Sequence, residues 1–165
     1  MKNFRINLIY VILGVVILSL GLALIHSYFL ATEEIKVYFS DSQGQYLMTE
    51  SRGIRKYNLP EGAVEELISG PTAKEASITI PEGVELLGLE IEAGRAEVDF
   101  SQEIVDDHWG GSAGEMMTVY SIVNTLTQFS EIDEVLILVE GEVRESLAGH
   151  LDLSKPLKFN SNLIN

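Results

Sequence analysis

The chain begins with a long stretch in which polar residues are almost absent. Residues 8–25 carry no charge, and at about 1.5 Å of helical rise per residue they span about 27 Å, close to the hydrocarbon core of a bilayer. Lys2 and Arg5 precede the run, and two glutamates are the first charges after it. Because positive residues favour the cytoplasmic side, this pattern predicts a single-pass transmembrane helix within residues 1–30, with the N-terminus in the cytoplasm.

A cleaved secretory signal peptide is the alternative interpretation of this segment. Its apolar region is normally about 7–15 residues long and is followed by a cleavage site of small residues. The run here is longer, and Phe29 and Leu30 disrupt most cleavage registers. A lipid anchor would need a cysteine, and the chain has none. The sequence therefore favours an uncleaved anchor, with residues 31–165 forming one extracytoplasmic domain.

Within that domain, several segments alternate between apolar and polar residues, as strands with one solvated face do. A continuous apolar run near the C-terminus predicts a central strand that is covered on both faces. The predicted strands are 35–40, 46–56, 85–92, 96–100 and 135–139. A polar turn joins the first two strands into a hairpin.

Two segments repeat apolar residues at helical spacing. The first is a short helix that Asn58 would cap and Gly70 would end. The second is the longest helix of the domain, in which Ser112 and Glu115 match a capping box and Phe129 lies near the end. The resulting order is β-β-α-β-β-α-β, an α+β domain in which both helices are expected to cover one face of a sheet.

Charge restricts the partners of this domain. Residues 31–165 hold all 25 acidic residues and nine of the eleven basic ones, a formal charge of −16. Such a surface repels nucleic acid and anionic lipid head groups, which excludes both as main partners. It would attract a basic protein or divalent cations, although acidity also simply keeps a domain soluble. Without cysteine, neither disulfides nor thiol catalysis is available.

The loop over residues 101–112 contains the side chains that come nearest to a catalytic set. Ser101, Asp106 and His108 are the residue types of a nucleophilic triad, but the glycines that usually present such a serine are missing. Asp106, Asp107 and His108 are metal-ligand types, yet adjacent side chains rarely converge on one ion. We therefore predict no catalytic residue, no metal site and no cofactor. Trp109 is the one ring in an exposed setting, where it would stack on a sugar or a partner protein, or pack its own loop.

Six short segments, in this order, are similar to the GerMN domain of sporulation and germination proteins. The segments are Val37–Phe39, Leu67–Pro71, Ile80–Val84, Ala96–Ser101, Ser121–Leu126 and Val139–Gly141. The resemblance covers residues 35–158. It implies a fold resembling ring-building motifs, an envelope location and binding to other proteins rather than an active site. Asp99 and Ser101 are the polar members of these segments that are most open to a functional role, although turn capping explains them as well.

The sequence thus leads to a membrane-anchored binding or scaffold module, acting in sporulation or germination, with envelope proteins or a second copy as partners. The candidate interaction residues are Asp99, Ser101 and Trp109. The alternative is a protein that binds or remodels peptidoglycan, which predicts a groove lined by Trp109 and polar groups. A cleaved, freely secreted protein is the third hypothesis.

Overall fold

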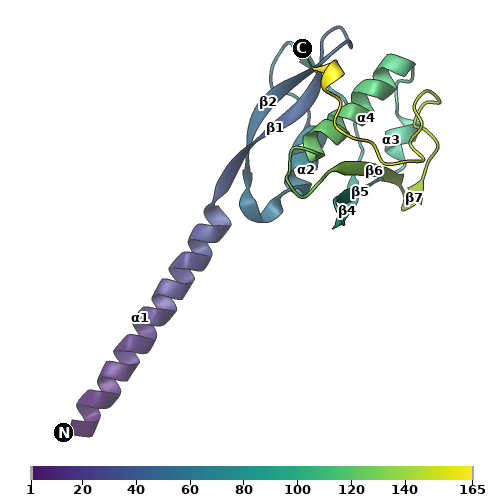
Figure 1. The fold of residues 1–165 in the computed structure, drawn as a ribbon. Coiled ribbons are helices and arrows are strands. Elements are labelled where there is room, and N and C mark those ends of the chain that lie inside the picture. Colours follow the sequence, from purple (N-terminus) through teal and green to yellow (C-terminus); the bar gives the residue numbers. More distant parts are fainter. Residues whose placement is uncertain (1, 165) are drawn as a thin grey trace.

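A single long helix leads into the folded part of the chain. The computed structural model describes residues 2–164, in which α1 (Lys2–Leu30) extends away from the remaining elements (Figure 1). From Tyr10 to Leu30 its large apolar side chains are exposed, and the domain meets the helix only at its last turn, where Tyr57 packs against Phe29. The helix contains the whole of the predicted apolar run.

The first sheet is built on the predicted N-terminal hairpin. β1 (Thr32–Asp41) pairs antiparallel with β2 (Leu47–Arg55), and the two-residue β3 (Ala76–Ser77) pairs antiparallel with the last two residues of β1 on its other edge. Elsewhere along that edge, no strand of residues 2–164 pairs with β1, and two of its amides donate to side chains instead. The amide of Lys36 donates to Gln128 Oε1, and the amide of Tyr38 donates to Thr125 Oγ1. The edge of β1 is therefore closed to further pairing where these bonds form.

The second sheet has the order β4-β5-β6-β7. β4 (Leu86–Glu92) and β5 (Arg95–Phe100) form a hairpin, β6 (Glu134–Val139) runs parallel to β5, and β7 (Glu142–Val143) returns antiparallel to β6. A parallel pair requires a crossover. The crossover here contains the short α3 (Glu103–Asp106) and the long α4 (Ser112–Leu126). As predicted, β6 is a central strand, and most of its side chains are buried.

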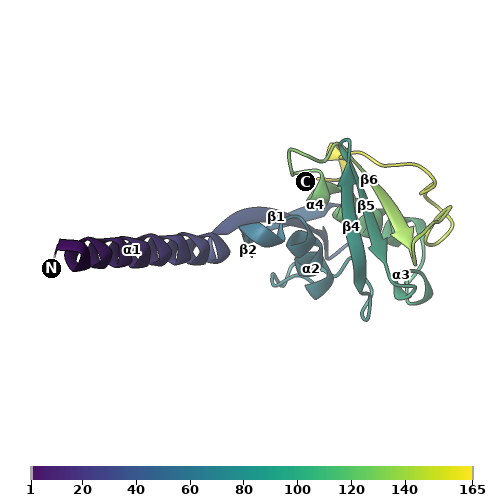
Figure 2. The same ribbon diagram turned by 90° about the horizontal axis from the view of Figure 1, so that it is seen from below.

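Helices α2 (Glu61–Ser69) and α4 contact strands of both sheets, as Figure 2 shows from below. One continuous core joins these layers, and its fully buried side chains include Phe39, Leu67, Phe100, Ile122 and Val135. The predicted element order and the α+β class are confirmed. The expected single sheet is wrong, because the strands divide into two sheets and α4 is buried on most of its circumference between them.

Both predicted N-terminal helix caps are wrong, whereas the predicted end of α2 at Gly70 is correct. The side-chain Nδ2 of Asn58, in the 3₁₀ turn η1 (Lys56–Asn58), donates to Glu65 Oε2 at 3.0 Å, and the cap position of α2 is held by Pro60. At α4 the cap position is Gly111, without a side-chain hydrogen bond. Glu115, the second half of the predicted capping box, is fully buried and binds a different segment. At both sites, contacts with other parts of the domain determine the hydrogen bonds of the side chain that the local pattern predicts as a cap.

The C-terminal segment packs back onto the domain. Leu157 forms a bridge with Val135 of β6, and Ile164, which follows the 3₁₀ turn η2 (Ser161–Leu163), forms one with Leu47 of β2. The side chain of Leu153 is almost completely buried. This segment has no regular apolar pattern, yet it contacts both sheets.

Candidate functional site

Asp99 lies on β5 and faces the turn between β6 and β7. Its Oδ1 accepts a hydrogen bond from the amide of Gly141 at 2.9 Å. Glu140 and Gly141 both have positive φ, 54° and 75°, so the carboxylate stabilises a strained two-residue connection. The observed contact is structural, and the interaction role of Asp99 stays a prediction.

Ser101 is buried at the end of β5. Its Oγ accepts a hydrogen bond from the amide of Glu85 at 2.9 Å, and its own amide donates to the Glu85 carbonyl at 3.0 Å. The hydroxyl also binds Glu103, which lowers the pKa of that carboxyl below its ordinary value. These bonds fix the start of β4 against the end of β5 and leave the serine without access to solvent.

His108 takes part in a separate hydrogen-bond chain. Its Nδ1 accepts from the amide of Gly110 at 2.9 Å, which makes Nε2 the protonated nitrogen, 3.1 Å from Thr118 Oγ1. The Thr118 hydroxyl in turn donates to the Thr79 carbonyl. Burial lowers the pKa of His108, while the charge of Glu115 opposes that shift. Ser101 and His108 thus bind different partners, and the paired geometry of a catalytic triad is not formed.

The acidic loop residues do not form a metal site either. Asp106 accepts a hydrogen bond from the side chain of Gln102, while Asp107 is exposed. Among the side chains that the structure describes, those of residues 10–164, no three of metal-ligating type come together.

Trp109 lies at the edge of an open groove. Its ring is 48% exposed and stacks on His108, with centroids 5.1 Å apart. The indole also lies against the first turn of α4, where a Cβ on Gly114 would come within 2.5 Å of Trp109 Nε1. Only glycine permits this approach. Of the three predicted interaction residues, Trp109 is the most exposed, Asp99 is partly exposed and Ser101 is buried.

The groove runs between the β1–β2 turn and the start of α4. Its part beside Trp109 has a volume of about 390 Å³ and includes the exposed Ile78. A second part, of about 450 Å³, shares Gly44, Ala113 and Met117 with the first. We call the two parts together the Trp109 groove; its principal lining residues are Ser42, Gln43, Tyr46, Ile78, Trp109, Ala113, Met116, Met117 and Leu163.

Polar and apolar side chains are unevenly distributed along the Trp109 groove. The turn residues Ser42 and Gln43 lie at the Trp109 end, and Met116 and Leu163 lie at the other. Asp41 also borders the groove, but its Oδ1 accepts from the amide of Gln45 at 2.8 Å. This bond and others to the turn backbone hold its pKa below the ordinary value. The groove therefore offers a ring, thioethers and turn amides, but no assembled acid–base pair.

Sequence reasoning missed most of this groove. Ile78 lies in a segment without regular pattern, and the helical spacing of Met116 predicts a buried position, although its side chain is only partly buried. The turn after β1 looks like any hairpin turn. Only the packing of α4 against β1 brings these segments together, and no local signal in the sequence reports that contact.

Glu115 is the most deeply buried charged residue of the domain. It is 0% exposed, and its carboxylate accepts three backbone hydrogen bonds, from Leu147 and Ala148 at Oε1 and from His150 at Oε2, at 2.8–3.0 Å. The carboxylate thereby fastens the loop after β7 onto α4. A buried carboxylate is tolerated when its oxygens are satisfied in this way.

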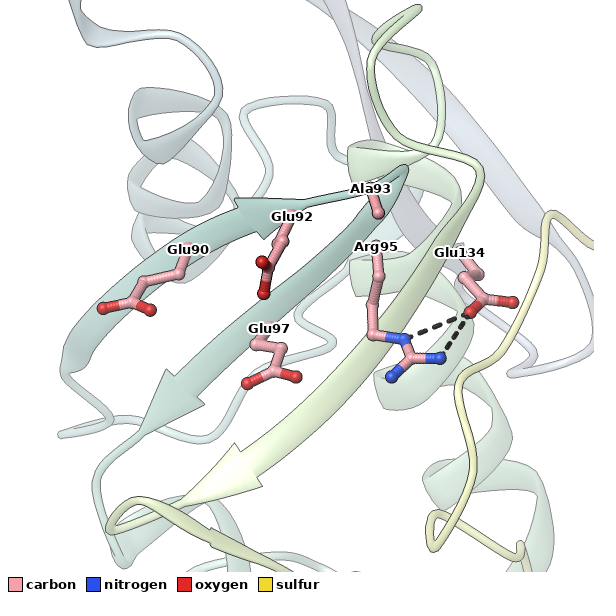
Figure 3. A pocket seen from close by; sticks show the side chains of 6 residues that line it. All are labelled: Glu90, Glu92, Ala93, Arg95, Glu97 and Glu134. Atoms are coloured by element: carbon pink, nitrogen blue, oxygen red, sulfur yellow. Dashed lines mark hydrogen bonds and ion pairs between the residues drawn. The ribbon is translucent and has the colours of Figure 1, made fainter.

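A second hollow, of about 250 Å³, lies on the outer face of β4, β5 and β6 (Figure 3). The side chains of Glu90, Glu92 and Glu97 extend over this face, and Glu90 and Glu97 are directly opposite in the β4–β5 register. Arg95 donates from Nε and Nη2 to Glu134 Oε1, both at 3.1 Å. The arginine thus binds β6 rather than its neighbours on β4. Nothing but acidity distinguishes this face as a site.

At the other end of the molecule, the part of α1 from Tyr10 to Leu30 is 21 residues long and apolar enough to cross a membrane. The Trp109 groove lies far from it, because β1 leads away from α1 to the turn that forms one groove wall (Figure 1). Ten strand residues at about 3.3 Å each separate the two by about 30 Å.

Comparison with known proteins identifies the domain. A family model described as Germane, sporulation and spore germination, matches residues 36–145. The chain belongs to the Germane family. The search of curated proteins finds no match.

Solved structures support the same conclusion for the fold. The first GerMN domain of the sporulation protein GerM from Bacillus subtilis is 25% identical, with a TM-score of 0.66; the match covers 77% of this chain and 98% of that one. The tandem GerMN domains of the same protein match at 24% identity and a TM-score of 0.66, over 78% of this chain. This Germane chain spans 46% of that tandem structure. A protein from Clostridium perfringens named as a lipoprotein is 25% identical, with a TM-score of 0.56, over 78% of this chain and 88% of its own.

Proposed function

We propose that this Germane protein is a membrane-anchored binding module of the bacterial envelope, which acts in sporulation or germination and has no enzymatic activity. The proposal rests on one observation. A helix able to span a bilayer lies at one end of the protein, and an open groove lined by the ring of Trp109 lies at the other end. Such an arrangement suits a protein that presents a binding surface at a set distance from a membrane.

The direction of insertion follows from the charges that flank the helix. Lys2 and Arg5 stand before the apolar run, whereas Glu33 and Glu34 follow it. The positive-inside tendency then favours a cytoplasmic N-terminus and an extracytoplasmic domain. Membership of a family described as sporulation and spore germination, together with the similarity to a GerMN domain of a sporulation protein, supports a role in sporulation or germination.

Binding is favoured over catalysis by the way in which polar groups are used. Ser101, His108 and Glu115 each make hydrogen bonds to backbone or to a buried threonine, so that none is free to act on a substrate. By contrast, Trp109 and Ile78 leave about half of their surfaces in solvent. Exposed rings beside apolar side chains are typical of surfaces that bind proteins.

A photo-crosslinker at Ala113 in full-length protein, expressed in native cells, tests this proposal. Ala113 is exposed and lines both parts of the groove, while Leu87 on β4 is also exposed, lies outside the groove and serves as the control position. We expect a defined envelope protein to be captured from Ala113 but not from Leu87, with capture lost in Trp109→Ala. Equal capture at both positions would contradict a specific groove.

Peptidoglycan binding is the second candidate, because one observation favours it. The Trp109 end of the groove combines an aromatic ring with the polar side chains of Ser42 and Gln43, and rings of this kind pack against sugar faces. Sedimentation of the protein with purified peptidoglycan, abolished by Trp109→Ala, would establish this function. Absence of sedimentation together with protein capture at Ala113 would exclude it.

A further inference from the structure

The junction between α1 and the domain contains no flexible linker. α1 ends at Leu30 and β1 begins at Thr32. The carbonyl of the single residue between them, Ala31, accepts a hydrogen bond from the amide of Lys56 at 2.9 Å. The Nζ of Lys56 also lies 3.4 Å from Glu33 Oε2. The turn η1, which follows β2, is therefore tied to the point where the helix becomes a strand.

An aromatic contact strengthens this junction. The ring of Tyr57, in η1, packs against the ring of Phe29 in the last turn of α1, with centroids 5.1 Å apart and planes inclined at 54°. Phe29 also contacts Tyr28, at 5.9 Å. Despite its contact with Phe29, Tyr57 remains 45% exposed. A ring from the folded domain thus stands beside the rings that end the apolar helix.

The position of Tyr57 relative to a bilayer follows from the length of the helix. Residues Tyr10–Leu30 would extend about 31 Å as an α-helix, which matches a hydrocarbon core of about 30 Å. Phe29 would then lie at the outer boundary of that core. Because Tyr57 touches Phe29, it lies at the same depth, where tyrosine is enriched since its ring is apolar and its hydroxyl is polar.

We propose that Tyr57 inserts into the outer interface of the same bilayer and gives the domain a second membrane contact. This inference rests on the membrane anchoring in the proposed function. The occupant of the exposed ring face is the boundary between lipid head groups and acyl chains, in continuity with the end of α1. Arg55 and Lys56 precede the ring and are exposed, as are Glu33 and Glu34 on the paired strand β1; at this depth the two basic side chains would meet the lipid phosphates. The strongly acidic remainder of the domain would be repelled from anionic head groups, which favours this orientation.

Tryptophan fluorescence in vesicles tests the contact directly. The full chain has one tryptophan, Trp109, so Tyr57→Trp and Tyr28→Trp are each made with Trp109→Phe, and the unchanged chain supplies a reporter remote from the membrane. The proteins are reconstituted into phosphatidylcholine vesicles whose acyl chains are brominated near the head group. Far-UV circular dichroism melts check that each variant is folded.

We expect bromine to quench most of the emission at positions 57 and 28 and almost none at Trp109. Quenching at position 28 without quenching at position 57, in folded protein, would overturn this inference while leaving the anchor intact. Absence of quenching at both positions would refute membrane anchoring, and with it this part of the proposed function. If Tyr57→Trp does not fold, Tyr57→Cys with an environment-sensitive thiol dye replaces it, since the chain has no other cysteine.

Discussion

Two groups of glutamates in this domain have opposite relations to their surroundings. Glu115 and Glu50 are buried or nearly so, and each accepts several hydrogen bonds from segments distant in sequence. Glu90, Glu92 and Glu97 lie together on the exposed face of β4 and β5, and no ion pair to a basic side chain of residues 10–164 forms with them. The first group fastens loops, whereas the second concentrates like charge.

The difference shows that the glutamates behind the formal charge of −16 on residues 31–165 have different physical effects. An exposed glutamate contributes solubility and mutual repulsion. A glutamate bound by backbone amides acts instead as a local fastening, because its removal leaves buried donors without acceptors. Counting acidic residues cannot separate these roles, but substitution can.

The largest effect is expected at Glu115. Glu115→Gln places an amide NH₂ against backbone donors in the loop 147–150, and we expect it to lower the free energy of unfolding by about 3 kcal/mol. The measurement is chemical denaturation of the full chain in detergent. Glu82→Gln, at an exposed position, is the matched control and should change stability little. A loss at Glu115 no greater than at Glu82 would remove the distinction between the two groups.

A somewhat smaller effect is expected at Glu50. Burial disfavours its charged form, but hydrogen bonds from the Thr72 and Ala73 amides, the Thr72 hydroxyl and Arg52 outweigh burial and lower its pKa to about 2. Glu50→Gln should cost about 2 kcal/mol at neutral pH.

The contribution of Glu50 to stability should depend on pH. Because the pKa of Glu50 is lower in the folded state than its ordinary value of 4.5, its contribution is complete above about pH 4.5 and is lost as the pH falls towards 2. Wild-type stability should therefore decline over that range more steeply than that of Glu50→Gln. Parallel pH profiles for the two proteins would refute the assigned pKa.

The smallest effect, of opposite sign, is expected on the exposed sheet face. Glu97→Gln removes the like charge opposite Glu90, and like charges facing each other across strands are unfavourable. We expect the free energy of unfolding to rise by about 0.5 kcal/mol. The gain should shrink as salt is added, because salt screens exposed charges. A decrease in stability would mean that Glu97 has a favourable contact of its own.

Much of the fold could be predicted because its elements have strong local patterns. The hairpin of β1 and β2, the stop at Gly70 and the continuous run in β6 are encoded within short segments. The division into two sheets could not be predicted, since it depends on α4 packing against both. Its buried Thr118, Ser121 and Asn124 are polar, so apolar periodicity gives no sign that this side of the helix is covered.

The candidate site was less predictable for the same reason. Trp109 could be singled out as a lone ring in a polar loop, but the groove beside it needs Ile78, Met116 and the turn after β1, which are unrelated in sequence. Ser112 and Glu115 have the spacing of a capping box, but this spacing is misleading. Glu115 is buried and accepts hydrogen bonds from the loop 147–150 instead of capping the helix. A short motif cannot state which backbone amides its carboxylate will meet.

Because α1 passes directly into β1, the orientation of the helix determines the position of the domain. If α1 crosses a bilayer and moves with the domain as one body, then tilting the helix swings the groove sideways. Transmembrane helices tilt by about 20° on average, and more in thin bilayers; at a height of about 30 Å above the interface, as strand geometry gives, that tilt displaces the groove by about 10 Å. Membrane thickness would then determine where the groove is presented, with no change inside the domain.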